Sequence, residues 1–141
     1  AAVADALVAE YGARVLLLHG PDEAAVADAV AAHACTPLLR LPGPPSVAQL
    51  KAAVSLLDLM VSNDTGPRHL AVAFGVPVIC VMGPTSPRYT ASPWERGEVV
   101  RMEVDCGPCQ RPYCATDHRC MTGIAPARVV RAAAAWLPAR V

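Results

Sequence analysis

The sequence alternates short strand-like runs with stretches of helical period, and this alternation limits the fold more than any other feature. Strand patterns lie at 14–20, 36–42, 58–63, 76–83 and 98–103. Helical patterns lie at 21–34, 46–57, 66–75 and 125–137. Strands that alternate with helices of this length form βαβ units, in which the strands are parallel and the helices cover them. We therefore expect an α/β fold with a Rossmann-like parallel sheet and flanking helices.

Residues at the expected helix ends support these boundaries. Pro21 opens one helix, and Pro126 lies in the first turn of the last one. Ser46 is followed three residues later by Gln49, which is the spacing of a capping box. Gly75 follows an apolar helical pattern and is suited to the position just after a helix end.

Composition and charge narrow the class of protein. The chain has 141 residues, of which 54% are hydrophobic, so we expect a single domain with its own core. Twelve basic residues balance twelve acidic ones, which argues against a nucleic-acid-binding surface. The first ten residues carry two acids and no lysine or arginine, so they do not resemble a signal peptide. We expect a cytoplasmic domain, and its opening within a helical pattern predicts a fragment without its N-terminal part.

A polar run, "SNDTGPRH" at 62–69, separates two apolar elements and is the main candidate for a binding site. It lies where a strand ends and a helix begins, and open parallel sheets bind ligands at that edge. Asp64 or Thr65 can cap the helix, Gly66 allows a ligand to approach the backbone, and Pro67 begins the helix. Free amides at a helix start bind anions, and His69 lies one turn further on. These residues therefore predict a phosphate or diphosphate site, while the alternative is a plain helix cap with His69 on the surface.

Four of the six cysteines lie close together in a loop with the spacing C-x2-C-x4-C-x5-C, namely Cys106, Cys109, Cys114 and Cys120. Four thiols within so short a segment are enough for one structural zinc ion or one iron–sulfur cluster, and His118 is an alternative ligand. The spacing matches neither a standard zinc finger nor a ferredoxin, and a reduced loop without metal is the other interpretation. Cys35 and Cys80 have apolar neighbours, so we expect both in the core.

The stretch "VSNDTGPRHLAVAFGVPVICVMGPTSP" resembles the signature of glycosyltransferase family 9. That signature contains D-T/S-G-P-x-H-L-A, then G-x-P, then a strand that ends in G-P-T-x-P. The matching positions are Asp64, Thr65, Gly66, Pro67, His69, Leu70, Ala71, Gly75, Pro77, Gly83, Pro84, Thr85 and Pro87. The downstream "CGPCQRPYCATDHRCMTGIAPARVV" resembles the cysteine segment and last helix of the lipopolysaccharide heptosyltransferase II branch. The resemblance covers residues 14–137.

The resemblance implies a GT-B enzyme of two Rossmann-like domains, with residues 1–141 forming the C-terminal, donor-binding domain as a fragment that lacks the N-terminal acceptor domain. It implies that Asp64, Thr65, Gly66 and His69 surround the diphosphate and sugar of the donor. It also implies an inverting reaction that requires no cofactor and whose general base lies in the missing domain. We therefore expect no catalytic residue in this chain, which would bind donor without turning it over.

Two further residues follow from the resemblance. Glu23, in the junction "HGPDE", is a candidate for the ribose hydroxyls, although an acid at that position also favours a helix start. Thr85, in "GPTSPR", lines the donor site or merely turns the chain.

The implied partners are ADP-heptose as donor and a lipid-linked saccharide of the lipopolysaccharide core as acceptor, reached at the inner face of the inner membrane. Two alternatives stay open. One is a related transferase with another nucleotide sugar, and the other is a non-catalytic binding module stabilised by metal at the cysteines.

Overall fold

The computed structural model describes residues 1–137, which divide into two compact units: residues 1–53 and residues 54–137. Parallel strands and adjoining helices occur in both units, as the sequence predicted. The expectation that residues 1–141 form one domain stays a prediction.

The first unit contains a two-stranded parallel sheet. Its elements are α1 (Ala2–Tyr11), β1 (Leu16–Leu17), the 3₁₀ helix η1 (Pro21–Glu23), α2 (Ala24–His33), β2 (Leu39–Arg40) and the start of α3 (Val47–Ser55). Strand β1 pairs with β2 through Leu16 opposite Leu39 and Leu17 opposite Arg40. Leu7 of α1 and Ala27 of α2 are buried.

Side-chain hydrogen bonds fix two local features of this unit. The Asp5 carboxylate accepts hydrogen bonds from the backbone N–H groups of Cys35 and Thr36, which ties α1 to the segment after α2. At the start of α3 the Ser46 N–H donates to Gln49 Oε1 at 2.9 Å, and the Gln49 N–H donates to Ser46 Oγ at 3.3 Å. The capping box expected at Ser46 is therefore confirmed.

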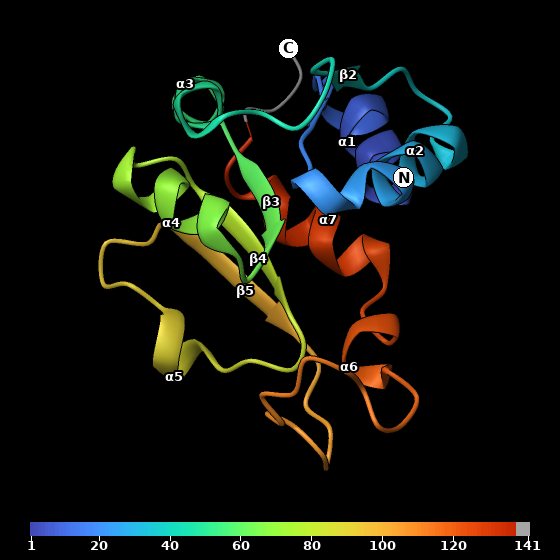
Figure 1. Cartoon of the computed structure of the whole chain (residues 1–141), viewed down its shortest axis with the longest axis vertical. Helices are drawn as coiled ribbons and strands as arrows, with labels where there is room; N and C mark the ends of the chain where they lie inside the picture. Colours follow the sequence, from blue (N-terminus) through green and yellow to red (C-terminus); the bar gives the residue numbers. More distant parts are fainter. Residues whose placement is uncertain (138–141) are drawn as a thin grey trace. The chain divides into compact units, whose positions relative to one another are not determined.

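The second unit contains a three-stranded parallel sheet with the order β3-β4-β5 (Figure 1). Its elements are β3 (Met60–Asn63), α4 (Gly66–Ala73), β4 (Val78–Met82), α5 (Pro87–Thr90), β5 (Gly97–Arg101), α6 (Arg119–Thr122) and α7 (Pro126–Ala134). Helix α4 packs against β3 and β4, and α7 packs against β4 and β5. Val78, Ile79 and Cys80 of the central strand have no exposed surface, so β4 forms the middle of the core. Because β3 and β4 are parallel neighbours, their carboxyl ends lie at the same edge of the sheet.

The elements differ from the expectations mainly in extent. The strands expected at 14–20 and 36–42 pair with each other over only two residues each. The helix expected at 21–34 begins with one 3₁₀ turn before α2. Helices α5 and α6 had no counterpart in the predicted pattern, yet α5 has a recognisable start: the Ser86 hydroxyl accepts the Arg88 N–H, and Pro87 is the first helical residue.

The two cysteines expected in the core lie in different surroundings. Cys80 is fully buried in β4, as predicted. Cys35 is exposed, so that prediction is wrong. The physical reason is its position two residues after the end of α2, where its backbone N–H donates to Asp5 and its side chain is exposed.

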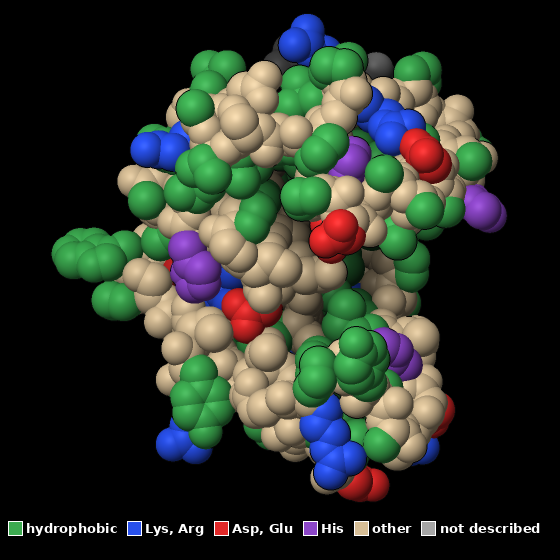
Figure 2. Space-filling view, in the orientation of Figure 1, with side chains coloured by type: hydrophobic (Ala, Val, Ile, Leu, Met, Phe, Trp, Pro, Cys, Tyr) green, Lys and Arg blue, Asp and Glu red, His purple; other side chains and the backbone are tan. Residues whose placement is uncertain are grey.

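The surface carries its charge in small groups. On the face in Figure 2, Lys and Arg side chains lie apart from one another among acidic and uncharged groups. Within residues 1–137, none of the helices has the length and apolar content needed to cross a membrane.

Candidate functional site

The start of helix α4 is open to solvent. Thr65 precedes the helix in an extended conformation, with φ −140° and ψ 171°, and its side chain makes no capping hydrogen bond in the part of the chain that the structure describes. Within residues 1–137, the Gly66 N–H has no hydrogen-bond acceptor, and a Cβ added at Gly66 would meet nothing within 4 Å. The interpretation in which Asp64 or Thr65 caps these amides is therefore wrong. An uncapped helix start leaves partial positive charge and a free donor facing solvent.

The Asp64 carboxylate turns away from the amides and into an ion network. Arg68, one turn further along α4, donates from Nη1 to Asp64 Oδ1 at 2.7 Å. The Thr90 hydroxyl donates to Asp64 Oδ2 at 3.2 Å. Both carboxylate oxygens are thus occupied by groups of the protein, which explains why the helix start lacks its expected cap.

Arg68 is the centre of this network. Its side chain has no exposed surface, and it donates from Nε and Nη2 to the two oxygens of Glu95, each at 2.7 Å. Its Nη1 also donates to Thr90 Oγ1 at 3.1 Å. Paired N–H groups facing both oxygens of one carboxylate are a strong, directional arrangement. Arg68 therefore joins α4 to α5 and to the segment before β5.

The network shifts the pKa values of its members. Burial raises the pKa of Asp64, but contacts with the Thr85, Arg68 and Thr90 side chains outweigh it, so the pKa lies below its ordinary value. The hydrogen bonds to Glu95 raise the pKa of Arg68. Burial raises the pKa of the neighbouring Cys80 thiol to about 11. At neutral pH Asp64 and Arg68 are therefore charged and Cys80 is a neutral thiol.

The other residues predicted from the family resemblance lie in two places. His69 is exposed on α4 and lines a shallow groove together with Trp94, whose side chain is also exposed. Thr85 follows β4 at the sheet edge where Asp64 follows β3; its hydroxyl oxygen is buried and makes no hydrogen bond of ordinary geometry to residues 1–137, although it lies close enough to lower the pKa of Asp64.

Glu23 belongs to the first unit and closes a local turn. Its carboxylate accepts the Gly20 N–H at 2.7 Å, which is the helix-start role that an acid commonly takes there. Its part in ribose binding stays a prediction.

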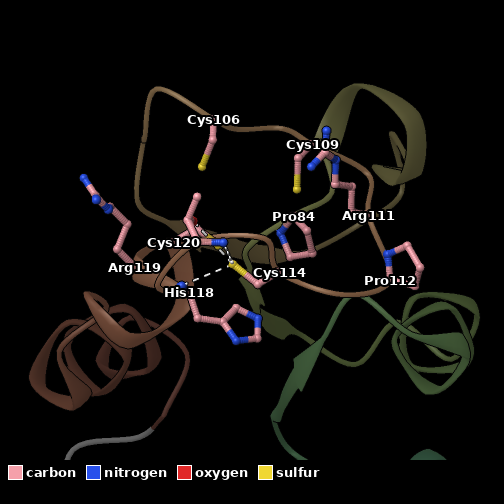
Figure 3. Close-up of a pocket in the computed structure, with 10 residues that line it drawn as sticks. Pro84, Cys106, Cys109, Arg111, Pro112, Cys114, His118, Arg119 and Cys120 are labelled. Carbon is pink, nitrogen blue, oxygen red and sulfur yellow. Dashed lines mark hydrogen bonds between the residues drawn. The ribbon is translucent and has the colours of Figure 1, made fainter.

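The four clustered cysteines line one pocket, which Figure 3 shows together with Pro84 and His118. The side chains of Cys106 and Cys109 point toward the sulfur of Cys114. Cys114 Sγ accepts hydrogen bonds from the Thr116 and His118 N–H groups, and the Thr116 hydroxyl and these N–H groups lower its pKa. Across the described part of the chain, however, no three Cys, His, Asp or Glu side chains are placed to hold a metal ion together. The metal site stays a prediction.

Arg68, Thr90 and Glu95 are the residues that sequence reasoning missed. The spacing of the first was visible in the sequence, since Arg68 follows Asp64 by four residues, but Asp64 lies before α4 and not on the helix. The Arg68 side chain is buried rather than exposed to solvent. Glu95 lies 27 residues further on and had no local signal.

Comparisons with known proteins agree with one another on the family of the relatives. Residues 1–119 match the family model described as glycosyltransferase family 9 (heptosyltransferase). A protein named lipooligosaccharide heptosyltransferase 2, from Campylobacter jejuni subsp. jejuni serotype O:2, is 34% identical over 83 residues, which are 57% of this chain and 26% of that protein. A protein of the same name from Haemophilus influenzae is 38% identical over 56 residues, 38% of this chain and 16% of that protein.

A solved structure shows the same fold. The crystal structure of a glycosyl transferase family 9 protein from Veillonella parvula superposes with a TM-score of 0.82 at 22% identity, covering 95% of this chain and 39% of that one. The α/β fold class predicted from the sequence is thereby confirmed. The chain spans about a quarter of the length of the Campylobacter relative, 26%.

Proposed function

Because this chain belongs to glycosyltransferase family 9, we propose that it is the donor-binding domain of a glycosyltransferase and that the start of α4 binds the donor diphosphate. The observation that carries the proposal is the open helix start, where the Gly66 amide has no acceptor among residues 1–137 and a Cβ added at Gly66 would meet nothing within 4 Å. A diphosphate supplies the negative charge and the acceptor oxygens that such a helix start lacks.

The reaction makes use of that charge complementarity. An acceptor hydroxyl oxygen forms a bond to the anomeric carbon of the donor, while the bond from that carbon to the diphosphate oxygen breaks and leaves its electron pair on the diphosphate. Attack from the face opposite the leaving group inverts the anomeric centre. Negative charge grows on the diphosphate as it leaves, and amides already aimed at it stabilise the transition state without reorganising.

The other candidate residues have supporting roles in this proposal. His69, exposed one turn into α4, donates a hydrogen bond to the diphosphate or the sugar. Thr85 places its buried hydroxyl at the same sheet edge, beside Asp64, and completes the donor site. Asp64 contributes to sugar recognition only through the part of its carboxylate that Arg68 and Thr90 leave accessible. Glu23 contributes to the ribose hydroxyls.

We propose ADP-heptose as the donor and a saccharide of the lipopolysaccharide core as the acceptor. The support is the name of the Campylobacter relative, lipooligosaccharide heptosyltransferase 2, and the heptosyltransferase description of the family model. The general base that takes the proton of the acceptor hydroxyl belongs to the acceptor-binding domain, and the lipid part of the acceptor places the enzyme at the inner face of the inner membrane. A transferase that uses another nucleotide sugar is the main alternative, since the diphosphate is common to all such donors.

Three glycine substitutions test the site. Gly66→Ala places a methyl group in the open space at the helix start, and we expect ADP affinity, measured by calorimetry, to fall about tenfold because an amide–phosphate hydrogen bond is lengthened. The helix start itself tolerates alanine, so the thermal midpoint should change little.

Gly43 and Gly75 provide the matched controls. A Cβ at Gly43 also meets nothing within 4 Å, so Gly43→Ala should change neither affinity nor stability. Gly75 has φ 70°, and Gly75→Ala should lower the free energy of unfolding by about 1 kcal/mol while ADP affinity stays the same. If Gly66→Ala binds ADP as tightly as the wild type, the diphosphate does not lie at this helix start.

A further inference from the structure

The buried ion network beside the helix start has a feature that stability does not explain. Arg68 is the largest side chain without exposed surface among residues 1–137, and it takes two carboxylates into the interior with it. The Asp64 and Glu95 side chains are only 8% and 10% exposed. Buried charged groups of this kind are often replaceable by apolar ones at no loss of stability, so their presence favours a role beyond holding the fold.

The network also removes an arginine from the reach of the ligand. An arginine at the second position after a helix-start glycine would ordinarily be a strong phosphate ligand because its planar N–H groups match two oxygens. Here Nε and Nη2 are bound to Glu95, and Nη1 is bound to Asp64 and Thr90. Arg68 therefore acts on the helix start through Asp64 and not by direct contact.

Asp64 is the residue whose position matters. An aspartate two residues before a backbone N–H commonly accepts a hydrogen bond from it, and Asp64 stands in that relation to Gly66. In the structure its oxygens face Arg68 and Thr90, and the Gly66 N–H stays free. An Asp64 that turned to this amide would occupy the site and would bring a negative charge against an incoming anion.

We propose that Arg68, oriented by Glu95, is a positioning residue that holds the Asp64 carboxylate away from the start of α4 and neutralises its charge, leaving the Gly66 amide free for an anionic ligand. The two hydrogen bonds from Arg68 to Glu95 fix the plane of the guanidinium group, and Nη1 is then aimed at Asp64. Thr90 holds the second Asp64 oxygen. This inference rests on the proposed function, since it assigns a purpose to the open helix start.

The test measures the affinity for inorganic pyrophosphate by calorimetry in two variants of the chain. Arg68→Met/Glu95→Leu keeps Asp64 but replaces both charged neighbours with apolar side chains of similar size. Adding Asp64→Ala to this pair removes the competing carboxylate as well. We expect the first variant to bind at least about tenfold more weakly than the wild type and the second to return to within about threefold of it.

Recovery of pyrophosphate affinity on adding Asp64→Ala distinguishes a positioning role of Arg68 from direct ligand contact or a role in stability alone. If Arg68 touched the ligand directly, or only held the fold, the added substitution would not restore binding. A second variant that stays as weak as the first overturns the proposal, as does a first variant that binds as tightly as the wild type.

The exchange rate of the Gly66 amide hydrogen, measured by NMR without ligand, distinguishes this proposal from the proposed function. We expect exchange to slow about tenfold in Arg68→Met/Glu95→Leu, because Asp64 then accepts the Gly66 N–H, and unchanged exchange overturns the positioning role. A wild-type chain that binds no pyrophosphate contradicts the diphosphate site, while slowed exchange in the variant would still support the positioning of Asp64. Thr90→Val is the alternative variant if Arg68→Met/Glu95→Leu does not fold, because it frees one Asp64 oxygen. We expect it to bind pyrophosphate about threefold more weakly and to slow the exchange of the Gly66 amide hydrogen. No change in either quantity overturns the proposal.

Discussion

Asp64 illustrates, at the scale of single residues, what a sequence pattern can and cannot determine. Its place at the end of β3 and before α4 was predicted from the order of apolar and polar residues, and the structure confirms that place. The hydrogen-bond partner of its carboxylate was not predicted. Local rules favour the nearby amides as partners of the carboxylate. Instead, Thr90 binds it directly and Glu95 orients the Arg68 that binds it, and both residues lie more than 20 residues away in the sequence.

The charge of Asp64 makes a pH-dependent contribution to stability. In the folded chain its pKa lies below its ordinary value of 3.8, so the deprotonated form of Asp64 stabilises the folded state more than the protonated form does. This contribution is fully present above the unfolded pKa and is lost as the pH falls through the folded pKa. We expect Asp64→Asn to lower the free energy of unfolding at pH 6 by about 2 kcal/mol, because a charged hydrogen bond to buried Arg68 is weakened.

Urea unfolding at pH 6 and pH 3 checks this prediction. The wild type should lose more stability between the two pH values than Asp64→Asn does. Asp5 and Asp117 also have lowered pKa values, but both are present in either chain, so their contributions cancel in the comparison. Equal losses in the two chains would mean that Asp64 is not held in its charged form by the network.

Helix α4 shows, at the scale of elements, that the two ends of one helix are built differently. Its C-terminal end is closed: the Gly75 N–H donates to the Val72 carbonyl at 3.0 Å and the Val76 N–H to the Ala71 carbonyl at 2.9 Å. This pattern was predicted from Gly75, since a glycine just after an apolar helical stretch commonly ends it in this way. Its N-terminal end has no such closure, and that difference supports a ligand at one end only.

The cysteine-bearing segment was predicted as a loop after the strand at 98–103, and the structure adds the short helix α6, which contains Cys120. Hydrogen bonds lower the pKa of Cys114, and burial raises that of Cys80. Because the thiolate is the reactive form, we expect iodoacetamide at neutral pH to modify Cys114 first and Cys80 last. Cys35 is a matched control, since it is exposed but lies outside the loop.

Peptide mass spectrometry measures the order in which the cysteines are modified. Zinc and iron analysis of the reduced chain measures bound metal. If the segment is a reduced loop without metal, six thiols, the number of cysteines in the chain, will be free. One bound zinc or one iron–sulfur cluster, with the four loop cysteines protected together, would instead favour the interpretation as a metal-stabilised module.

For the whole molecule, the fold class followed from sequence because buried parallel strands and amphipathic helices have different periods. β3 and β4 lie within the strands predicted at 58–63 and 76–83, and each begins two residues later than predicted. Short pairings such as β1 with β2 were overestimated, because an apolar run shows what is buried and not how far a neighbouring strand extends. The base and sugar of the donor were beyond reach, since a helix start distinguishes an anion from a neutral group but not one nucleotide from another.

Backbone amide shifts during a titration with ADP test the central claim most directly, with AMP as the comparison. If the start of α4 binds the diphosphate, ADP will shift the amide signals of Thr65 and Gly66, and AMP, which lacks the second phosphate, will need at least about tenfold higher concentration for the same effect. A folded chain in which ADP leaves both amides unmoved would contradict the assignment of the donor site to this helix.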